Sequence, residues 1–344
     1  MTHMATLKAT KTPLSSIFFG GGTPSLMPPS LVERIISHAH KTFGFVANIE
    51  ITAEANPTSV EATALSGFRD AGINRVSMGV QALAPHHLAF LGREHSAEEA
   101  LKALEVARTL FDRVSIDLIY GLPNQSIDEW RQTLDKLFGL GLDHLSLYQL
   151  TIEPGTVFFT RTRRGETMTA PDDDAADMFD MTHDIAAECG LPSYEISNFA
   201  RQGAECRHNL IYWRAQDWLG IGPGAHGRIT NSTKRIGLAT RRSPQGWLEA
   251  VKRHGHGIET QTDENIDDQV AEILMMGLRL SEGVNIEAME RRFGLRQNWL
   301  NIDRLDNLLA ENLLNLTQTC DGNRLSTTMT GRLYLNQVLA DLLV

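Results

Sequence analysis

The sequence predicts an α/β protein with a curved parallel sheet or barrel, followed by a small domain that is mostly helical. Short apolar runs alternate with helical stretches over the first two thirds of the chain, and the pattern becomes predominantly helical near residue 261. Alternating strands and helices imply parallel strands with right-handed crossovers, which favours a barrel over an antiparallel sandwich. The predicted parts are a disordered tail (1–13), the barrel (14–155), the barrel's tail with an irregular cap (156–260) and a C-terminal domain (261–344).

The barrel prediction depends on five apolar runs and on the helix starts between them. Each helix start has a Ser or Thr three residues before a Glu, the pattern of a capping box, in which each side chain bonds the other's backbone N–H. The strand candidates are Ser16–Phe19, Glu50–Ala53, Arg75–Met78, Val114–Ile119 and His144–Gln149. The capping candidates are Ser30 with Glu33, Thr58 with Glu61, Ser96 with Glu99 and Ser126 with Glu129.

The C-terminal part has helical spacing and one hairpin signal. Its first amphipathic helix is marked by Ile266, Val270, Ile273, Leu274 and Leu278. We expect one helix at 173–188 in the preceding segment and, in this part, helices at 286–293 and 302–314, a hairpin of 316–319 and 324–327, and a last helix over about 330–343. The hairpin turn is Asp321-Gly322, a favoured two-residue pair. This order of elements is winged-helix-like, but the segment is not strongly basic, so packing or a partner role is favoured over DNA binding.

Bulk properties exclude several classes of protein. The 344 residues carry a formal charge of −10, which disfavours nucleic acid as a partner. The three cysteines, Cys189, Cys206 and Cys320, are too far apart in sequence for a disulfide framework, a zinc motif or an iron–sulfur motif. Reduced thiols, the absence of a long apolar run and the absence of a secretory signal together predict a cytoplasmic protein.

Polar and glycine residues follow the predicted strands, where ligands bind in parallel sheets. The run Gly20-Gly21-Gly22-Thr23-Pro24 follows the first strand, and its glycines let the backbone approach a ligand closely. Glu54, Gln81 and Asp117 lie at or near the ends of the next three strands. Together with Arg93, which can clamp a carboxylate, these groups suit an amino acid joined to a nucleoside. The alternatives are a tight turn for the glycines and internal salt bridges or caps for the charged groups.

Successive motifs resemble those of the HemW branch of the radical-SAM superfamily. They are IFFGGGTPSL, EITAEANPTSV, RVSMGVQAL, LGREHS, IDLIYGLPNQS, LSLYQLTIEPGT, YEISNFA, HNLIYW and GIGPGAHG, in order across roughly 14–344. The branch is similar to oxygen-independent coproporphyrinogen III dehydrogenase (oxidase), but YQLTIEPGT and HNLIYW favour HemW.

The resemblance implies a partial (β/α)6 barrel that binds S-adenosylmethionine, and haem binding with transfer to acceptor haemoproteins. By motif, Gly21, Gly22 and Thr23 would hold the methionyl end of S-adenosylmethionine. Glu54, Gln81, Arg93 and Asp117 would hold its ribose and carboxylate.

One departure from the resemblance concerns the cluster. The family carries a CxxxCxxC loop that holds a [4Fe–4S] cluster, and its first strand precedes that loop. We expect this chain to begin just before the second strand, with no cluster ligands, no radical catalysis and weakened S-adenosylmethionine binding. The strand Ser16–Phe19 would then be an exposed apolar edge.

Cys206-Arg207-His208-Asn209-Leu210-Ile211-Tyr212-Trp213 is the candidate haem segment. His208 is the candidate axial ligand, Tyr212 and Trp213 are candidate contacts of the macrocycle, and Cys206 is an alternative thiolate ligand. The motif HNxxYW is the one that the resemblance implicates in haem binding. His226 is a second candidate, and a histidine among aromatic residues is also common as a packed core group.

Three functional hypotheses remain open at this point. The leading one is a haem carrier whose partners are haem, acceptor haemoproteins and, by peripheral contact, respiratory enzymes of the membrane. The second is an S-adenosylmethionine-dependent, coproporphyrinogen-dehydrogenase-like enzyme, which requires a cluster. The third is an inactive remnant that folds poorly.

Overall fold

The computed structural model describes residues 12–231 and 234–343, apart from the side chains of residues 59–63 and 231. It divides into two compact units, which are described separately below. The first unit consists of Ile17–Glu33 and Glu50–Cys206, and the second of Met1–Ser16, Arg34–Ile49 and Arg207–Val344. Most of the predicted tail, 1–13, lies outside the described residues.

A six-stranded sheet with the order β1-β2-β3-β4-β5-β6 lies mostly in the first unit, although the first residues of β1 and β2 are assigned to the second. Its strands are β1 (Leu14–Phe19), β2 (Phe45–Ala55), β3 (Arg75–Gln81), β4 (Arg113–Tyr120), β5 (His144–Gln149) and β6 (Asn198–Ala200). The pairs β2–β3, β3–β4 and β4–β5 are parallel, and the short β6 is antiparallel to β5. The predicted fold class is confirmed: the protein is α/β with a curled half-barrel. Among the described strands β1 lies at one edge of the sheet, and its six residues are partly exposed.

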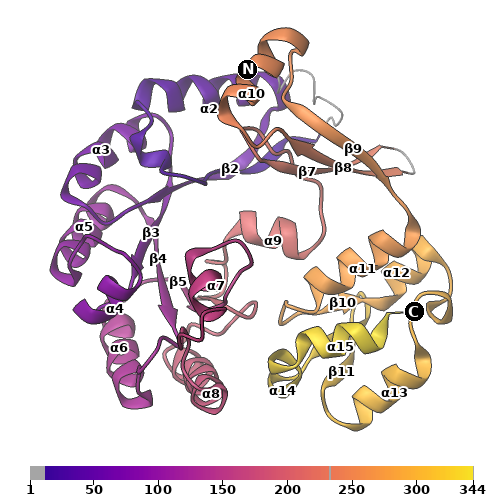
Figure 1. The fold of residues 1–344 in the computed structure, drawn as a ribbon. Helices are drawn as coiled ribbons and strands as arrows, with labels where there is room; N and C mark the ends of the chain where they lie inside the picture. Colours follow the sequence, from indigo (N-terminus) through magenta and orange to yellow (C-terminus); the bar gives the residue numbers. More distant parts are fainter. Residues whose placement is uncertain (1–11, 232–233, 344) are drawn as a thin grey trace. The chain divides into compact units, whose positions relative to one another are not determined.

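Helices follow the strands and lie around the outer side of the sheet, as α3, α5 and α6 show (Figure 1). The helices of this part are α2 (Pro29–Phe43), α3 (Ser59–Asp70), α4 (Pro85–Phe90), α5 (Ala97–Leu110), α6 (Ile127–Gly139), α7 (Val157–Thr162) and α8 (Asp172–Glu188). A 3-10 turn, η1 (Pro24–Leu26), precedes α2. Trp130 of α6 is buried, stacks on Tyr120 of β4 and donates its Nε1–H to Thr182 of α8 at 2.8 Å, so one side chain joins sheet and helices.

The predicted capping boxes have different outcomes. At α5 the box is complete, because Ser96 accepts from the backbone of Glu99 and the Glu99 carboxylate accepts from the backbone of Ser96. Ser30 lies within the first turn of α2 instead of at its N-cap. The side chain of Glu61 lies outside the described part of the chain. At α6, Ser126 caps the helix, but the Glu129 carboxylate turns to two histidines of α4.

The second unit contains an antiparallel sheet that the sequence analysis missed. Its strands are β7 (His226–Asn231), β8 (Lys234–Thr240) and β9 (Ile258–Glu264), with α9 (Arg207–Trp213) before them and α10 (Pro244–His254) between the last two. The sequence analysis expected an irregular cap over 156–260 and did not anticipate these three strands. The strand β9, IETQTDE, is mostly exposed and polar, so it carries no hydrophobic alternation that would reveal it.

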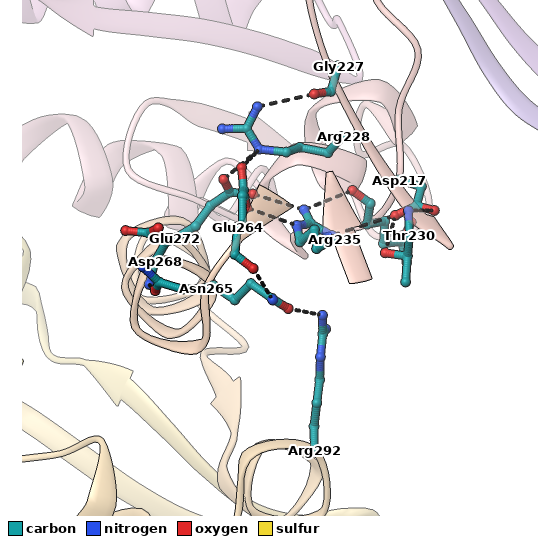
Figure 2. A network of polar contacts seen from close by, with 12 residues as sticks. Asp217, Gly227, Arg228, Thr230, Arg235, Glu264, Asn265, Asp268, Glu272 and Arg292 are labelled. Carbon is teal, nitrogen blue, oxygen red and sulfur yellow. Dashed lines mark hydrogen bonds and ion pairs between the residues drawn. The ribbon is translucent and has the colours of Figure 1, made fainter. Parts of the chain in front are cut away.

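Buried charges join this sheet to α11 (Ile266–Gly277). The guanidinium of Arg228 on β7 lies 2.7 Å from Glu264 and 2.8 Å from Glu272, and Arg235 on β8 lies 2.9 Å from Glu272 (Figure 2). Arg235 is 2% exposed and Glu272 is 8% exposed. Charges this deeply buried require partners, and the alternating Arg and Glu side chains supply them.

The C-terminal elements confirm the predicted helical region and hairpin. They are β10 (Val284–Asn285), α12 (Ile286–Phe293), η2 (Arg296–Asn298), α13 (Ile302–Ala310), β11 (Leu314–Thr319), β12 (Gly322–Thr327), α14 (Met329–Leu333) and α15 (Leu335–Leu342). The hairpin closes with Thr319 opposite Gly322, and β10 pairs on its other side. The predicted last helix is two helices, because Tyr334 leaves the helical conformation at φ −106° and ψ 21°. Among the described residues, no helix has the length and apolarity that crossing a membrane requires.

Candidate functional site

A polar pocket lies at the carboxyl ends of β2, β3 and β4, and it collects most of the predicted ligand residues. Its volume is about 220 Å³. Six of the predicted residues line it: Gly22, Thr23, Glu54, Gln81, Arg93 and Asp117. Gly21 is not in the lining, but its backbone N–H donates to the Glu54 carboxylate at 3.1 Å. The structure therefore brings all seven predicted residues to one place.

The glycine loop has a conformation that its residues explain. Gly21 and Gly22 have φ of 79° and 63°, in the left-handed region that favours glycine. Gly20 has no room for a side chain, because a Cβ atom there would lie 2.7 Å from the Phe18 ring and 3.3 Å from the Glu54 carboxyl carbon. The loop is thus held against Glu54, and it presents backbone groups to the pocket.

Asp117 is the most perturbed acid of the pocket. The Ser77 Oγ atom lies 3.1 Å and 3.2 Å from its two carboxylate oxygens. Burial raises the pKa of the Asp117 carboxyl to about 6, although hydrogen bonds from Ser146 and Ser77 oppose the rise. Near neutral pH the carboxylate is therefore ionised in a poorly solvated place, where a ligand hydroxyl group would be a favourable donor.

Gln81 ends β3 in a conformation that is uncommon for its residue type. Its φ is 69°, and the pairing of β3 with β4 shifts register between Met78 and Gln81. Non-glycine residues in this region are strained and often belong to functional sites. Gly79 makes room for the Gln81 side chain, because a Cβ atom at Gly79 would lie 2.6 Å from the Gln81 amide nitrogen. The bulge thus directs an amide donor and acceptor to the pocket.

The pocket combines complementary hydrogen-bonding groups. Glu54 and Asp117 supply acceptors, Gln81 and Arg93 supply donors, and the glycine loop supplies backbone groups. Such a set suits a ligand with hydroxyls, an ammonium group and a carboxylate. S-Adenosylmethionine has these groups, so the residues present fit it.

The sequence analysis did not single out Ser25 and Ser77, which also line the pocket. Asn56 and Gly79, which follow or end predicted strands, line it as well. Ser77, Gly79 and Gln81 alternate along β3, and alternate residues of a strand share a face. Because Gln81 was predicted to contact the ligand, the residues two and four positions before it on β3 should share its face. This alternation is the sequence signal that would have identified Ser77.

The candidate haem segment forms the helix α9, none of whose side chains is fully buried. His208 and Tyr212 lie one helical turn apart, with ring centroids 4.7 Å apart in a T-shaped arrangement. Tyr212 makes a second T-shaped contact with Trp218, at 4.8 Å. The sequence analysis did not single out Trp218. Trp213 is engaged elsewhere, because the Arg279 guanidinium lies 4.6 Å from the centre of its ring.

The alternative haem and metal ligands lie in other environments. Cys206 is 1% exposed, and its thiol donates to the Glu50 carboxylate at 3.6 Å. Cys189 and Cys320 are exposed. Within the described ranges no cysteine belongs to a group of three possible metal ligands. His226 is exposed at the start of β7.

Comparison with known proteins first gives the class. The family model described as the radical SAM superfamily matches residues 3–137, and the one described as the HemN C-terminal domain matches residues 266–334. Among solved structures, the coproporphyrinogen III oxidase HemN from Escherichia coli, titled a radical SAM enzyme, has a TM-score of 0.76 at 22% identity. That match covers 95% of this chain and 77% of HemN, and it shows a shared fold.

Relatives at higher identity define the family. The heme chaperones HemW of Haemophilus influenzae and Escherichia coli are each 37% identical over 95% of this chain and over 82% and 83% of their own lengths. The mitochondrial radical S-adenosyl methionine domain-containing protein 1 of Mus musculus is 40% identical, over 96% of this chain and 76% of its own length. The chain belongs to the HemW family of radical-SAM proteins. It spans 62% of the Bos taurus relative, which has the same name as the mouse protein.

Proposed function

We propose that this protein binds haem at α9 and delivers it to acceptor haemoproteins, on a scaffold whose pocket holds S-adenosylmethionine. The observation that carries the proposal is the arrangement of His208, Tyr212 and Trp218: the imidazole contacts the Tyr212 ring, the Tyr212 ring contacts Trp218, and no side chain of α9 is fully buried. The name of the bacterial relatives, heme chaperone, supports the same function.

Each residue of this group has a distinct part in the proposal. The His208 imidazole would ligate the haem iron, as histidine does in many haem proteins. Tyr212 and Trp218 supply aromatic surface for the macrocycle. Trp213, which sequence reasoning assigned to the macrocycle, lies against the Arg279 guanidinium and is left out of the proposed haem site. Cys206 is not part of the proposed haem site, because its thiol is buried against Glu50.

In the pocket, Glu54 and Asp117 would hold hydroxyl or ammonium groups of S-adenosylmethionine, and Arg93 would hold its carboxylate. Gln81 and the loop Gly21-Gly22-Thr23 would supply the remaining contacts, with Gly21 positioned by its hydrogen bond to Glu54. In the superfamily this molecule supplies a radical when it is bound beside a reduced cluster. The three cysteines of this chain do not fit a cluster of three thiolates, so no step of the proposal passes through one.

A haem titration tests the carrier function. Wild-type protein, His208→Ala and the control His226→Ala are titrated with haem, and the Soret band and affinity are recorded. We expect His208→Ala to shift the band and to weaken binding at least tenfold, while His226→Ala matches the wild type. Identical spectra and affinities for wild type and His208→Ala would exclude His208 as the ligand.

Transfer is measured separately from binding. The haem-loaded protein is mixed with an apo-haemoprotein, and we expect the acceptor's spectrum to appear at a rate that exceeds that of free haem. Incubation with S-adenosylmethionine and a reductant distinguishes the enzymatic hypothesis. A carrier forms no 5′-deoxyadenosine, whereas catalytic production of it by this chain would support the porphyrinogen dehydrogenase reading instead.

A further inference from the structure

Two histidines of α4 and one glutamate of α6 converge outside the pocket. The His86 Nε2 atom lies 3.3 Å from one carboxylate oxygen of Glu129, and the His87 Nε2 atom lies 3.3 Å from the other. None of the three residues lines the pocket, and none belongs to the proposed haem site. Their potential ligand atoms all lie within 4.8 Å of one another.

We propose that His86, His87 and Glu129 form a binding site for a transition-metal ion of the zinc class. In a tetrahedral zinc site the ligand atoms are about 2.0 Å from the ion, so neighbouring ligand atoms are about 3.3 Å apart. Both nitrogen–oxygen separations in this cluster have that value, each to a different oxygen of Glu129, and three ligand atoms, one from each residue, lie within 4.8 Å of one another. Side-chain rotations that bring these three atoms closer together would accommodate an ion of this size.

The burial of His87 is an independent observation that points to a ligand. The residue is 4% exposed, and its Nε2 atom is buried without a hydrogen bond of acceptable geometry, although Glu129 is close. Buried polar atoms in native structures nearly always have a partner. A cation between imidazole and carboxylate would satisfy both groups.

The conformation of Glu129 provides a second independent observation. Ser96-x-x-Glu99 and Ser126-x-x-Glu129 have the same capping pattern, and in both the serine caps its helix. The Glu99 carboxylate bonds back to the Ser96 backbone at 2.8 Å. The Glu129 carboxylate instead turns to the two imidazoles. Glu129 therefore does not make the usual capping contact, and its two carboxylate oxygens lie beside the Nε2 atoms of His86 and His87.

The two imidazoles converge even though they are consecutive in sequence. Their ring centroids are 4.0 Å apart and the rings are tilted by 48°, so both Nε2 atoms reach the same carboxylate. Pro85 begins α4 and the helix has only six residues, so both histidines lie in its first turn. Two imidazoles and one carboxylate are the ligand set of zinc and similar divalent ions, with the remaining position left to water. The His86 side chain is exposed, so an ion can reach the site from solvent.

An ion at this site would fix α4 to α6. Gln81 and Arg93, which both line the pocket, lie before and after α4 in sequence. The Arg93 N–H donates to the Leu88 carbonyl of α4 at 2.9 Å. The proposed ion would therefore restrain a segment that carries two pocket residues.

The test uses zinc alone and the whole chain. Wild type, His86→Ala, Glu129→Gln and the control His254→Ala are stripped with a chelator and titrated with Zn²⁺ by calorimetry. His254 is an exposed histidine of α10, so His254→Ala controls for nonspecific zinc binding by surface imidazoles. We expect one equivalent of zinc with micromolar or tighter affinity in the wild type and in His254→Ala, and at least tenfold weaker binding in the other two variants.

A second measurement identifies the ligands and guards against misfolding. X-ray absorption at the zinc edge should show nitrogen and oxygen neighbours at about 2.0 Å and no sulfur. His86 has a side chain that is 66% exposed, so His86→Ala should melt like the chelator-treated wild type. Equal zinc affinity in wild type and His86→Ala, sulfur in the coordination shell, or no binding by the wild type would each overturn the proposal.

Discussion

The hydroxyl of Ser77 on β3 lies against both carboxylate oxygens of Asp117 on the neighbouring β4, at 3.1 and 3.2 Å. The two strands are parallel, so both side chains reach the same end of the sheet. Ser77 supplies a donor to an acid that burial makes difficult to ionise. The carboxylate retains further acceptor sites for a ligand, because each of its oxygens has two lone pairs.

Replacement of Ser77 by alanine should weaken ligand binding. Without the hydroxyl, the pKa of Asp117 should rise further above about 6, and the carboxylate should be less well ordered. We expect the affinity for S-adenosylmethionine to fall by about 1 kcal/mol, or roughly fivefold. Calorimetry at pH 6.5 measures this, with Ser66→Ala, an exposed serine of α3, as control. Equal affinities for Ser77→Ala and the control would show that the Ser77 contact is unimportant.

Asp117→Asn should stabilise the ligand-free protein at neutral and basic pH. The pKa of Asp117 is raised from 3.8 to about 6 in the folded state, so the folded chain holds the proton more tightly than the unfolded chain. This contribution to stability is present below pH 3.8 and is lost as pH rises through about 6. The uncharged variant avoids that loss, and we expect a gain of about 1–3 kcal/mol at pH 8 that shrinks towards pH 4.

Urea unfolding of wild type and Asp117→Asn at both pH values measures this difference. Binding of S-adenosylmethionine should weaken in the same variant, because the ionised acceptor is gone. A stability difference that is independent of pH, or that grows towards acid, would falsify the assignment of a raised pKa.

Gly79→Ala should separate ligand binding from stability. The added Cβ atom would lie 2.6 Å from the Gln81 amide nitrogen, which is the end of a flexible side chain and can move away. We therefore expect a change of at most about 1 kcal/mol in the free energy of unfolding. The displaced amide should lower the affinity for S-adenosylmethionine several-fold. Paired urea unfolding and calorimetry test this, and a variant with unchanged affinity would mean that Gln81 does not contact the ligand.

Glu272→Gln should destabilise the second unit through the buried charges of Figure 2. The substitution removes the carboxylate that lies 2.8 Å from Arg228 and 2.9 Å from Arg235. Arg235 is almost completely buried, so its charge would be left with only more distant carboxylates. We expect a loss on the order of 2–4 kcal/mol in the free energy of unfolding.

Lys234→Gln provides the matched control for this network. Lys234 adjoins Arg235 on β8, but its ion pair with Asp263 is exposed on both sides. Exposed pairs contribute roughly 0–1 kcal/mol, so this variant should unfold almost like the wild type. Equal losses in the two variants would indicate that burial does not decide the strength of these pairs.

The parallel sheet was predictable because its strands are buried. β3 and β4 are buried along most of their length, and glycines and helix caps mark their limits, so the sequence signal is strong. The antiparallel sheet was missed for the opposite reason: β9 is exposed along most of its length and has no apolar face. β9 is a strand because its backbone pairs with that of β8. Backbone hydrogen bonds do not require a periodic pattern of side chains, so the sequence does not reveal them.

The pocket was predictable to the extent that its residues follow strands. Strand ends located Glu54, Gln81 and Asp117, but Ser77 lies within β3 and is visible only through alternation. The cluster of His86, His87 and Glu129 was not predictable. The pattern Ser126-x-x-Glu129 already accounted for Glu129 as a capping residue of α6, so nothing in the sequence indicated another partner. A local pattern states which contacts are available, and tertiary neighbours decide which of them forms.

The positions of the cysteines make the chain suitable for spectroscopic labelling. Cys206 is shielded, whereas Cys189 and Cys320 are accessible, and one of these belongs to each compact unit. A maleimide dye or nitroxide should therefore attach once per unit without any engineered substitution. Energy transfer or electron–electron dipolar spectroscopy between the two labels would follow the separation of the units directly as haem or S-adenosylmethionine is added.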